Sequence, residues 1–193
     1  MNATSFSQNG EDIEILNHCN KIGPHATILS IGENDGITLS NSYLSILKGY
    51  KAVLVEPDPS SFEKMRKLHE ENKNVLCLNW AIYPTDDRNY AGEVLFYRSG
   101  TLLGNGDQSL VSTMVLSEVE KWKKSGVEFT TIKVPALHVY SVILGSRYDV
   151  ISIDVEGVDL EILTEINLAE SGTSMVCIET NSITEREKIA IEY

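Results

Sequence analysis

The stretch TILSIGENDG, residues 27–36, decides the fold expected for this chain. Its first five residues are mostly apolar, which is typical of a short strand buried on both faces. The strand runs directly into Gly32-Glu33-Asn34-Asp35-Gly36, where two glycines allow positive φ angles and a close backbone approach to a ligand. The spacing is not G-x-G-x-x-G and no P-loop lysine follows, so a bound pyrophosphate is disfavoured. An ordinary tight strand-to-helix turn is the alternative interpretation.

Four further apolar runs are predicted as buried strands, at residues 52–55, 75–78, 149–154 and 175–179. Helical patterns are predicted at 8–20, 40–47, 159–166 and after a cap at Ser60 or Ser61. Buried strands that alternate with helices indicate βαβ units in an α/β fold, with a parallel sheet covered by helices on both faces. Ligands of such sheets bind at the carboxyl ends of the strands, so the residues found there are the candidates for a binding site.

An acid ends the second predicted strand. Glu56 follows the run 52–55, and its carboxylate can accept two hydrogen bonds from the hydroxyls of a ribose. A solvated acid in a proline-rich turn is the alternative. A glycine turn after one strand and an acid about 20–25 residues later, at the end of the next, together predict a nucleoside-binding site.

The third predicted strand leads into Asn79-Trp80-Ala81. A side chain here can lie beside an adenine ring, and the backbone amides can hydrogen-bond to the base. Core packing of Trp80 is the open alternative, because a buried tryptophan usually belongs to the core.

Three acids surround one glycine after the fourth strand, in Asp154-Val155-Glu156-Gly157-Val158-Asp159. Asp154 or Glu156 can take a proton from an acceptor hydroxyl or help to hold the sulfonium end of a cofactor. Capping of the following helix is the alternative, and both can hold together. His138 is a weaker candidate base, because its apolar surroundings favour packing.

The middle of the chain is less regular. Strands are expected near 94–97 and 130–134, helices near 115–122 and 137–144, and a loop at 99–107. The chain is predicted as a single domain, residues 1–193. Its parts are a helical cap (1–26), a cofactor-binding half (27–82), an irregular substrate-side insertion (83–135) and a second half (136–193) whose end from Ile183 is helical.

Composition excludes several partners. The 193 residues include 16 Lys+Arg and 28 Asp+Glu, a net charge of −12, which repels nucleic acids and gives no attraction to anionic membranes. No apolar run is long enough to cross a bilayer, and the first residues do not resemble a signal peptide. Three distant cysteines and four scattered histidines predict buried thiols and no metal site, and the expected compartment is the cytoplasm.

Several segments, in this order, resemble the FkbM-type methyltransferase family, a branch of the class I S-adenosylmethionine-dependent enzymes. They are residues 7–12 (SQNGED), 31–36 (IGENDG) with 39–41 (LSN), 55–57 (VEP) and 154–157 (DVEG). Each is weak alone, whereas the ordered set is fairly specific and covers most of the chain. The resemblance implies a Rossmann-like sheet, S-adenosylmethionine as methyl donor and a hydroxyl acceptor on a sugar or small natural product.

The resemblance also implies roles for individual residues. Gly32, Glu33, Asn34 and Gly36 are expected around the methionine and ribose, with Glu56 and Pro57 at the ribose. Trp80 and Ala81 are expected at the adenine, and Asp154 and Glu156 at the reacting end. The segment 7–12, with Gln8 and Asp12, is expected to close over the substrate, and Ser109 to lie in a substrate loop.

The sequence departs from the family pattern in two places. Ser30 stands where the family has an acid that supports the methionine end, and we hypothesise that Glu33 compensates for it. The sequence given ends at Tyr193, so the sheet is expected to lack the family's last two strands and to form a homodimer through the edge of its fifth strand.

Two other functions are weighed against methyl transfer. A protein that keeps the fold and binds a nucleotide or partner without catalysis is one alternative, for which Ser30 and the short C-terminus are the reasons. A nicotinamide-dependent oxidoreductase is the other, and the missing G-x-G-x-x-G disfavours it.

Overall fold

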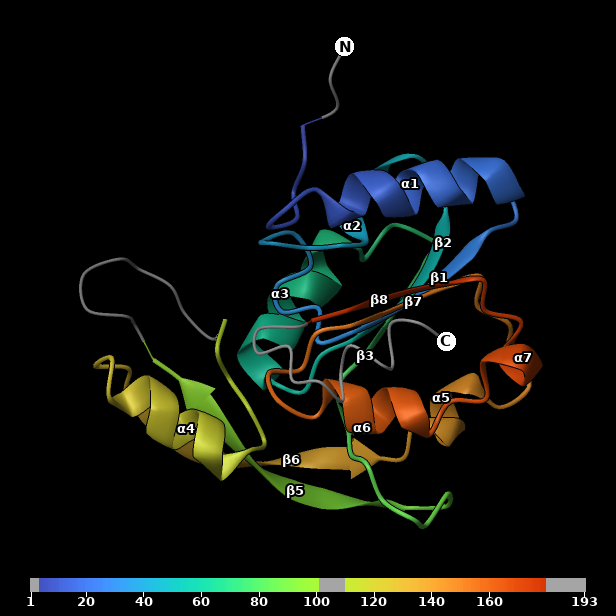
Figure 1. The fold of residues 1–193 in the computed structure, drawn as a ribbon. Helices are drawn as coiled ribbons and strands as arrows, with labels where there is room; N and C mark the ends of the chain where they lie inside the picture. The colour runs from blue at the N-terminus through green and yellow to red at the C-terminus, as the bar shows by residue number, and fades with distance from the viewer. Residues whose placement is uncertain (1–3, 101–109, 180–193) are drawn as a thin grey trace.

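The computed structural model describes residues 4–100 and 110–179, and its centre is one parallel sheet (Figure 1). Five strands lie in the order β3-β2-β1-β7-β8, and each neighbouring pair is parallel. The strands are β1 (Thr27–Ile31), β2 (Lys51–Val55), β3 (Val75–Leu78), β7 (Val150–Ile153) and β8 (Met175–Ile178). The predicted α/β, Rossmann-like class is confirmed. The strand order reverses between β1 and β7, which is where ligands of such folds bind.

Helices cover both faces of this sheet, as Figure 1 shows. One face carries α1 (Glu11–Ile22), α2 (Tyr43–Leu47) and α3 (Pro59–Leu68). The other carries α5 (Tyr140–Ile143), α6 (Asp159–Thr164) and α7 (Leu168–Ser171). Within the described ranges, no helix combines the length and the apolar character that a membrane crossing needs.

The side chains of β1 are mostly apolar on both faces of the strand because both faces are buried. Ile28 packs with Ile15 and Met65 in the core beneath α1 and α3. Leu29 packs with Ile151 and Ile162 in the core beneath α6. Successive side chains of a strand point to opposite faces, so both faces demand apolar residues. Full burial of one such side chain contributes about 1.5–3 kcal/mol.

A second, smaller sheet lies beside the first. It contains β4 (Ala81–Ile82), β5 (Ala91–Ser99) and β6 (Phe129–Leu137) in the order β4-β6-β5, with α4 (Leu116–Lys123) between β5 and β6 in sequence. β5 and β6 pair antiparallel along their whole length. The segment 83–135 is therefore more regular than the irregular insertion expected from the sequence, because two predicted short strands extend into one long ribbon.

Three element boundaries differ from the sequence-based expectation. Asp58, and not Ser60 or Ser61, caps α3, because its carboxylate accepts the amides of both serines. α1 begins at Glu11 after a left-handed Gly10, and residue 137 ends β6 instead of beginning a helix. The predicted loop 99–107 falls mostly outside the described residues, and the predicted C-terminal helix from residue 183 does so entirely.

Candidate active site

The glycine turn after β1 is held against the neighbouring strand β7. The Asp154 amide donates to the Ile31 carbonyl over 2.9 Å. A Cβ atom on Gly32 would lie 1.7 Å from the Asp154 carbonyl oxygen, and its φ is +86°. No side chain fits there, so glycine is required by the close approach of β1 and β7.

Glu56 lies at the end of β2, and its carboxylate is anchored by two backbone amides. The Asn34 amide donates to Oε2 over 2.8 Å, and the Asp58 amide donates to Oε1 over 2.7 Å. The side chain is buried, and this burial raises its pKa to about 8. The glycine turn and Glu56 therefore converge at one rim of the parallel sheet, on the same side.

Glu33 points inward from the glycine turn and is also buried. Its Oε1 accepts hydrogen bonds from the hydroxyls of Ser40 and of Ser42, the latter over 2.8 Å. Burial raises its pKa, and the surrounding serine hydroxyls, that of Ser30 included, oppose the rise. A carboxyl group is thus supplied beside Ser30, where the sequence lacks the expected acid.

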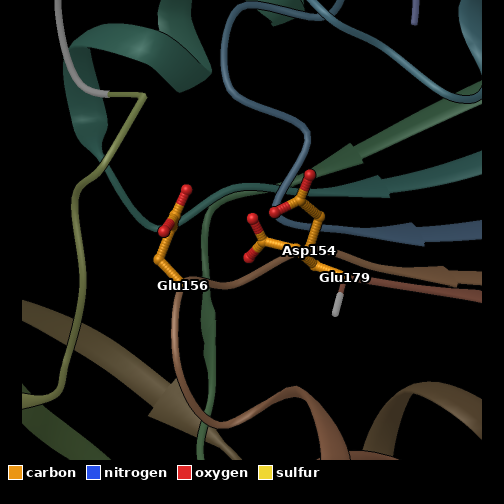
Figure 2. A group of neighbouring side chains, drawn as sticks. All are labelled: Asp154, Glu156 and Glu179. Atoms are coloured by element: carbon orange, nitrogen blue, oxygen red, sulfur yellow. The ribbon is translucent and has the colours of Figure 1, made fainter. Parts of the chain in front are cut away.

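Three carboxyl groups meet where β7 and β8 end. Figure 2 shows Asp154 and Glu179 side by side, with Glu156 across from them, and one oxygen of each lies within 4.8 Å of the others. Burial is the main cause that raises their pKa values, to about 6 for Asp154, about 8 for Glu156 and about 9 for Glu179. The charge of Asp159 adds to the rise for all three. The charge of Asp154 adds to it for Glu156 and Glu179, whereas a hydrogen bond with Glu179 lowers the pKa of Asp154. At neutral pH Glu156 and Glu179 therefore mostly keep their protons, and Asp154 is mostly ionised. The ionised carboxylate is suited to accept a proton or to attract a positive charge.

The same three carboxylates could hold a metal ion, although exposed acidic groups are common without one. The sequence-based expectation of no metal site considered only the spacing of histidines with cysteines or acids, and not acids alone. It missed this group because Glu179 is distant in sequence from the other two acids. The expectation of no metal stays a prediction.

Glu156 has an unusual backbone conformation for a residue with a side chain, with φ of +58°. Its carbonyl accepts a hydrogen bond of 2.7 Å from the Thr113 hydroxyl, which is fully buried. Next to it, a Cβ on Gly157 would lie 3.0 Å from Cγ of Glu118 and 3.3 Å from Cγ2 of Val115. The segment 113–118 thus packs directly on the loop that carries Glu156.

A cavity of about 680 Å³ opens between these elements. It is within the usual range for small-molecule sites, about 300–1,000 Å³. Ten of the residues predicted from the sequence line it: Gln8, Gly32, Glu33, Asn34, Glu56, Pro57, Trp80, Ala81, Asp154 and Glu156.

Two predicted site residues are placed elsewhere, and a third lies outside the described residues. Gly36 is buried behind the turn, where a Cβ would meet Met65 at 3.0 Å, so it shapes the turn and does not line the cavity. Asp12 is fully buried and accepts the hydroxyls of Ser5 and Ser7 and the Phe6 amide. It organises the turn that holds Gln8 and does not reach the cavity. Ser109 lies outside the described residues.

His138 is not part of the cavity wall. It is buried between β6 and α5, where Nδ1 accepts the Tyr140 amide over 2.9 Å and Nε2 lies 2.9 Å from Oε2 of Glu165. The packing role favoured from the sequence is consistent with this burial, although a polar contact and not only apolar packing holds the ring.

Further lining residues were not predicted as site residues. The sequence contained a signal for Ser40 and Asn41, which belong to the LSN segment, and Asn41 donates to the Ser152 hydroxyl over 3.2 Å. The others come from β5, α4, the segment before α4 and the strand ends, and nothing local marks them. Among these further lining residues are Ser40, Asn41, Phe96, Met114, Lys121, Trp122, Ser152 and Cys177.

Comparison with known proteins gives one positive result. A family model described as "Methyltransferase FkbM domain" matches residues 30–190. The match includes the glycine turn, Glu56 and the Asp154-Glu156 loop. No curated protein and no solved structure matches the chain.

Proposed function

This chain belongs to the FkbM methyltransferase family, and we propose that it transfers a methyl group from S-adenosylmethionine to a hydroxyl of a sugar or small natural product. One observation carries the cofactor assignment. The hydrogen bond of 2.8 Å from the Asn34 amide to Glu56 joins the glycine turn and the acid at one rim of the cavity. This is the geometry that holds an adenosine in Rossmann-like folds.

The residues present suit an adenosyl group. Each Glu56 oxygen accepts one backbone amide and keeps a second lone pair for a ribose hydroxyl. Trp80 and Ala81 line the cavity beyond Glu56, next to where a base attached to that ribose would lie. Trp80 is half-buried, so its ring both packs against the core and faces the cavity.

Glu33 supports the methionine end in our proposal and replaces the acid missing at Ser30. Its carboxyl lines the cavity, is buried and is fixed by Ser40 and Ser42. We expect Glu33→Ala to weaken S-adenosylmethionine binding about tenfold, the size of a lost charged hydrogen bond. Unchanged affinity in a folded Glu33→Ala variant would remove this role.

When bound, the cofactor would supply a methyl group on a positively charged sulfur. The residues of the chain then have two tasks. They hold the acceptor in line with the donor, and Glu156 or Asp154 removes the hydroxyl proton, a contribution of about 10²–10⁴-fold. A pKa of about 8 places Glu156 near the range in which a general base works best.

The apolar part of the cavity wall supports a small cyclic acceptor. Phe96 from β5, Met114, and Trp122 from α4 line the cavity together with the carboxyl groups. Aromatic and thioether side chains pack well against the apolar faces of rings. Carboxylates accept hydrogen bonds from hydroxyls.

Calorimetry tests the proposal without knowledge of the acceptor. The wild-type protein is titrated with S-adenosylmethionine, S-adenosylhomocysteine and NAD, and binding of the first two alone is expected. Glu56→Gln should lower affinity about tenfold, whereas Glu63→Gln, on the exposed side of α3, should not change it. Binding of NAD, or no effect of Glu56→Gln, would contradict the cofactor assignment.

A second candidate function is nucleotide binding without methyl transfer, and Ser30 is the observation that favours it. Binding of S-adenosylhomocysteine does not separate the two candidates. Mass spectrometry of hydroxylated sugars and small natural products incubated with the protein and isotopically labelled S-adenosylmethionine does, because a labelled product requires catalysis.

We also propose that the β8 edge pairs with a second copy of the chain. Within the described residues, β8 pairs with β7 alone, and its four residues are only half-buried. An unpaired edge of this kind favours strand addition. Light scattering that shows a monomer at all concentrations would exclude the pairing.

A further inference from the structure

We infer that Arg98 is a positioning residue for the cofactor half of the site: from the second sheet it holds Asp58, which in turn holds Glu56. This inference rests on the function proposed above and deepens it. Arg98 lies on β5, and its Nε donates to Oδ2 of Asp58. The Asp58 side chain is completely buried, whereas that of Arg98 is 34% exposed.

The two carboxylate oxygens of Asp58 have different partners. Oδ1 accepts the Ser60 amide over 2.8 Å, the Ser60 hydroxyl over 2.7 Å and the Ser61 amide over 3.0 Å, and so caps α3. Oδ2 accepts Arg98. Burial raises the pKa of Asp58, but the hydrogen bonds from Ser60, Ser61 and Arg98 outweigh it and leave the pKa lowered. The buried group is therefore an anion, and Arg98 is the cation that compensates it.

Asp58 connects this ion pair to the site. Its own amide is one of the two donors that fix the Glu56 carboxylate, over 2.7 Å. Its negative charge also raises the pKa of Glu56, as does the charge of Glu33. Arg98 thus acts on Glu56 in two ways: it fixes the position of an amide donor, and it neutralises an anion two residues away.

The geometry of β5 explains how a remote sheet reaches this loop. Residues 96 and 98 point to the same face of a strand. Phe96 is buried and lines the cavity, and Arg98, two residues further along β5, contacts Asp58. The second sheet therefore supports the part of the site around Glu56, which we propose for the cofactor, and through Phe96 it also lines the part that we propose for the acceptor.

The test measures S-adenosylhomocysteine affinity from pH 6 to 9 for the wild type, Arg98→Gln and Asp58→Asn. Arg66→Gln is the matched control, because Arg66 pairs with Glu63 on the exposed side of α3. We expect about tenfold weaker binding in Arg98→Gln, the effect of one lost charged hydrogen bond, and no change in Arg66→Gln. Arg98→Gln that folds and binds like the wild type would overturn the inference.

The pH profile separates positioning from a general loss of stability. The ionised Glu56 is the better acceptor of ribose hydroxyls, so affinity should rise through its pKa. Arg98→Gln leaves Asp58 uncompensated and moves this rise to higher pH, whereas Asp58→Asn removes the repelling charge and moves it to lower pH. Asparagine still caps helices, so Asp58→Asn provides the test where Arg98→Gln does not fold. Shifts in the same direction would overturn the inference.

A further readout does not depend on the cofactor. Amide hydrogen exchange at Asp58 should be faster in Arg98→Gln than in Arg66→Gln, because the amide loses its fixed position on Glu56. Where the wild type binds no S-adenosylhomocysteine, the proposed function fails, and exchange alone decides the role of Arg98. Equal exchange in the two variants would then overturn it.

Discussion

The two halves of the cavity that we propose for the cofactor, around Glu56, and for the acceptor, around Glu156, are built by different means. The cofactor half joins the turns after β1 and β2, and the backbone amides of Asn34 and Asp58 hold Glu56 in place. The acceptor half depends on distant side chains, as the Thr113 hydroxyl on the Glu156 carbonyl shows, 43 residues apart. The half that adjacent βα turns hold in place has no room for added atoms at the backbone. The half that side chains hold in place depends on individual hydrogen bonds.

Gly32→Ala should have the largest effect, because it disturbs the backbone contact that holds the cofactor half together. The new Cβ would lie 1.7 Å from the Asp154 carbonyl oxygen, so the ends of β1 and β7 must separate. We expect a loss of about 4 kcal/mol in unfolding free energy and no measurable S-adenosylhomocysteine binding. Urea denaturation and calorimetry measure the two quantities.

Gly49→Ala is the control for Gly32→Ala. Gly49 also has a positive φ, +92°, but nothing lies within 4 Å of its added Cβ. Its cost should be limited to backbone strain, about 1–2 kcal/mol, with normal binding. Equal losses in the two variants would show that strain, and not the contact with β7, makes Gly32 necessary.

The cofactor half was largely predictable from the sequence. A glycine turn and an acid that follow neighbouring strands are local patterns, and the parallel pairing of β1 with β2 brings them together without further information. Glu56, Asn34 and Gly32 line the cavity as expected. Gly36 lies behind the turn and not in the cavity wall, because a glycine pattern does not distinguish a residue that faces a ligand from one that packs behind the turn.

The acceptor half was predictable only in part. Asp154 and Glu156 follow a buried strand, so the end-of-strand rule found them. Phe96 and Trp122 reach the cavity through the pairing of β5 with β6 and the packing of α4, which are tertiary contacts that no local pattern encodes. Asp12 lies away from the cavity, because an acid near a helix start organises a turn as readily as it faces a substrate.

Thr113→Val tests the dependence of the acceptor half on one side chain. Valine keeps the shape but removes the hydroxyl that donates to the Glu156 carbonyl over 2.7 Å. The left-handed backbone of Glu156, with φ of +58°, should relax and turn its carboxyl away. We expect kcat for methyl transfer to fall about tenfold with unchanged S-adenosylhomocysteine affinity.

Thr113→Ser restores the hydroxyl and should recover most of the lost kcat. Thr113→Val that weakens cofactor binding as much as turnover would contradict the division of the cavity into two halves. Thermal unfolding of both variants accounts for the stability lost with the buried hydrogen bond, about 1–3 kcal/mol.

A smaller effect should separate S-adenosylmethionine from S-adenosylhomocysteine, which differ by one positive charge. Asp154, Glu156 and Glu179 have pKa values of about 6, 8 and 9 and lose protons between pH 6 and 9. A deprotonated group attracts the sulfonium but not the neutral thioether. The ratio of the two affinities should therefore favour S-adenosylmethionine several-fold more at pH 9 than at pH 6. A ratio independent of pH would place the three acids away from the sulfur.

The smallest expected effect is on the unfolding free energy of the protein without bound ligand. A carboxyl group whose folded pKa lies above its unfolded value binds more protons in the folded state, so its contribution is greatest below the unfolded pKa and is lost as pH rises through the folded one. For Glu156 and Glu179 this loss extends to about pH 8 and about pH 9.

The unfolding free energy in urea should therefore fall between pH 6 and 9. Glu156→Gln should flatten that fall, because it removes one titrating group and lowers the repulsion on Glu179. Glu63→Gln should leave the slope unchanged, since pairing with Arg66 lowers the pKa of Glu63 to about 2, outside this window. An equally steep fall in Glu156→Gln would mean that Glu156 is solvated in solution, and the acceptor half would then be more open than the cofactor half.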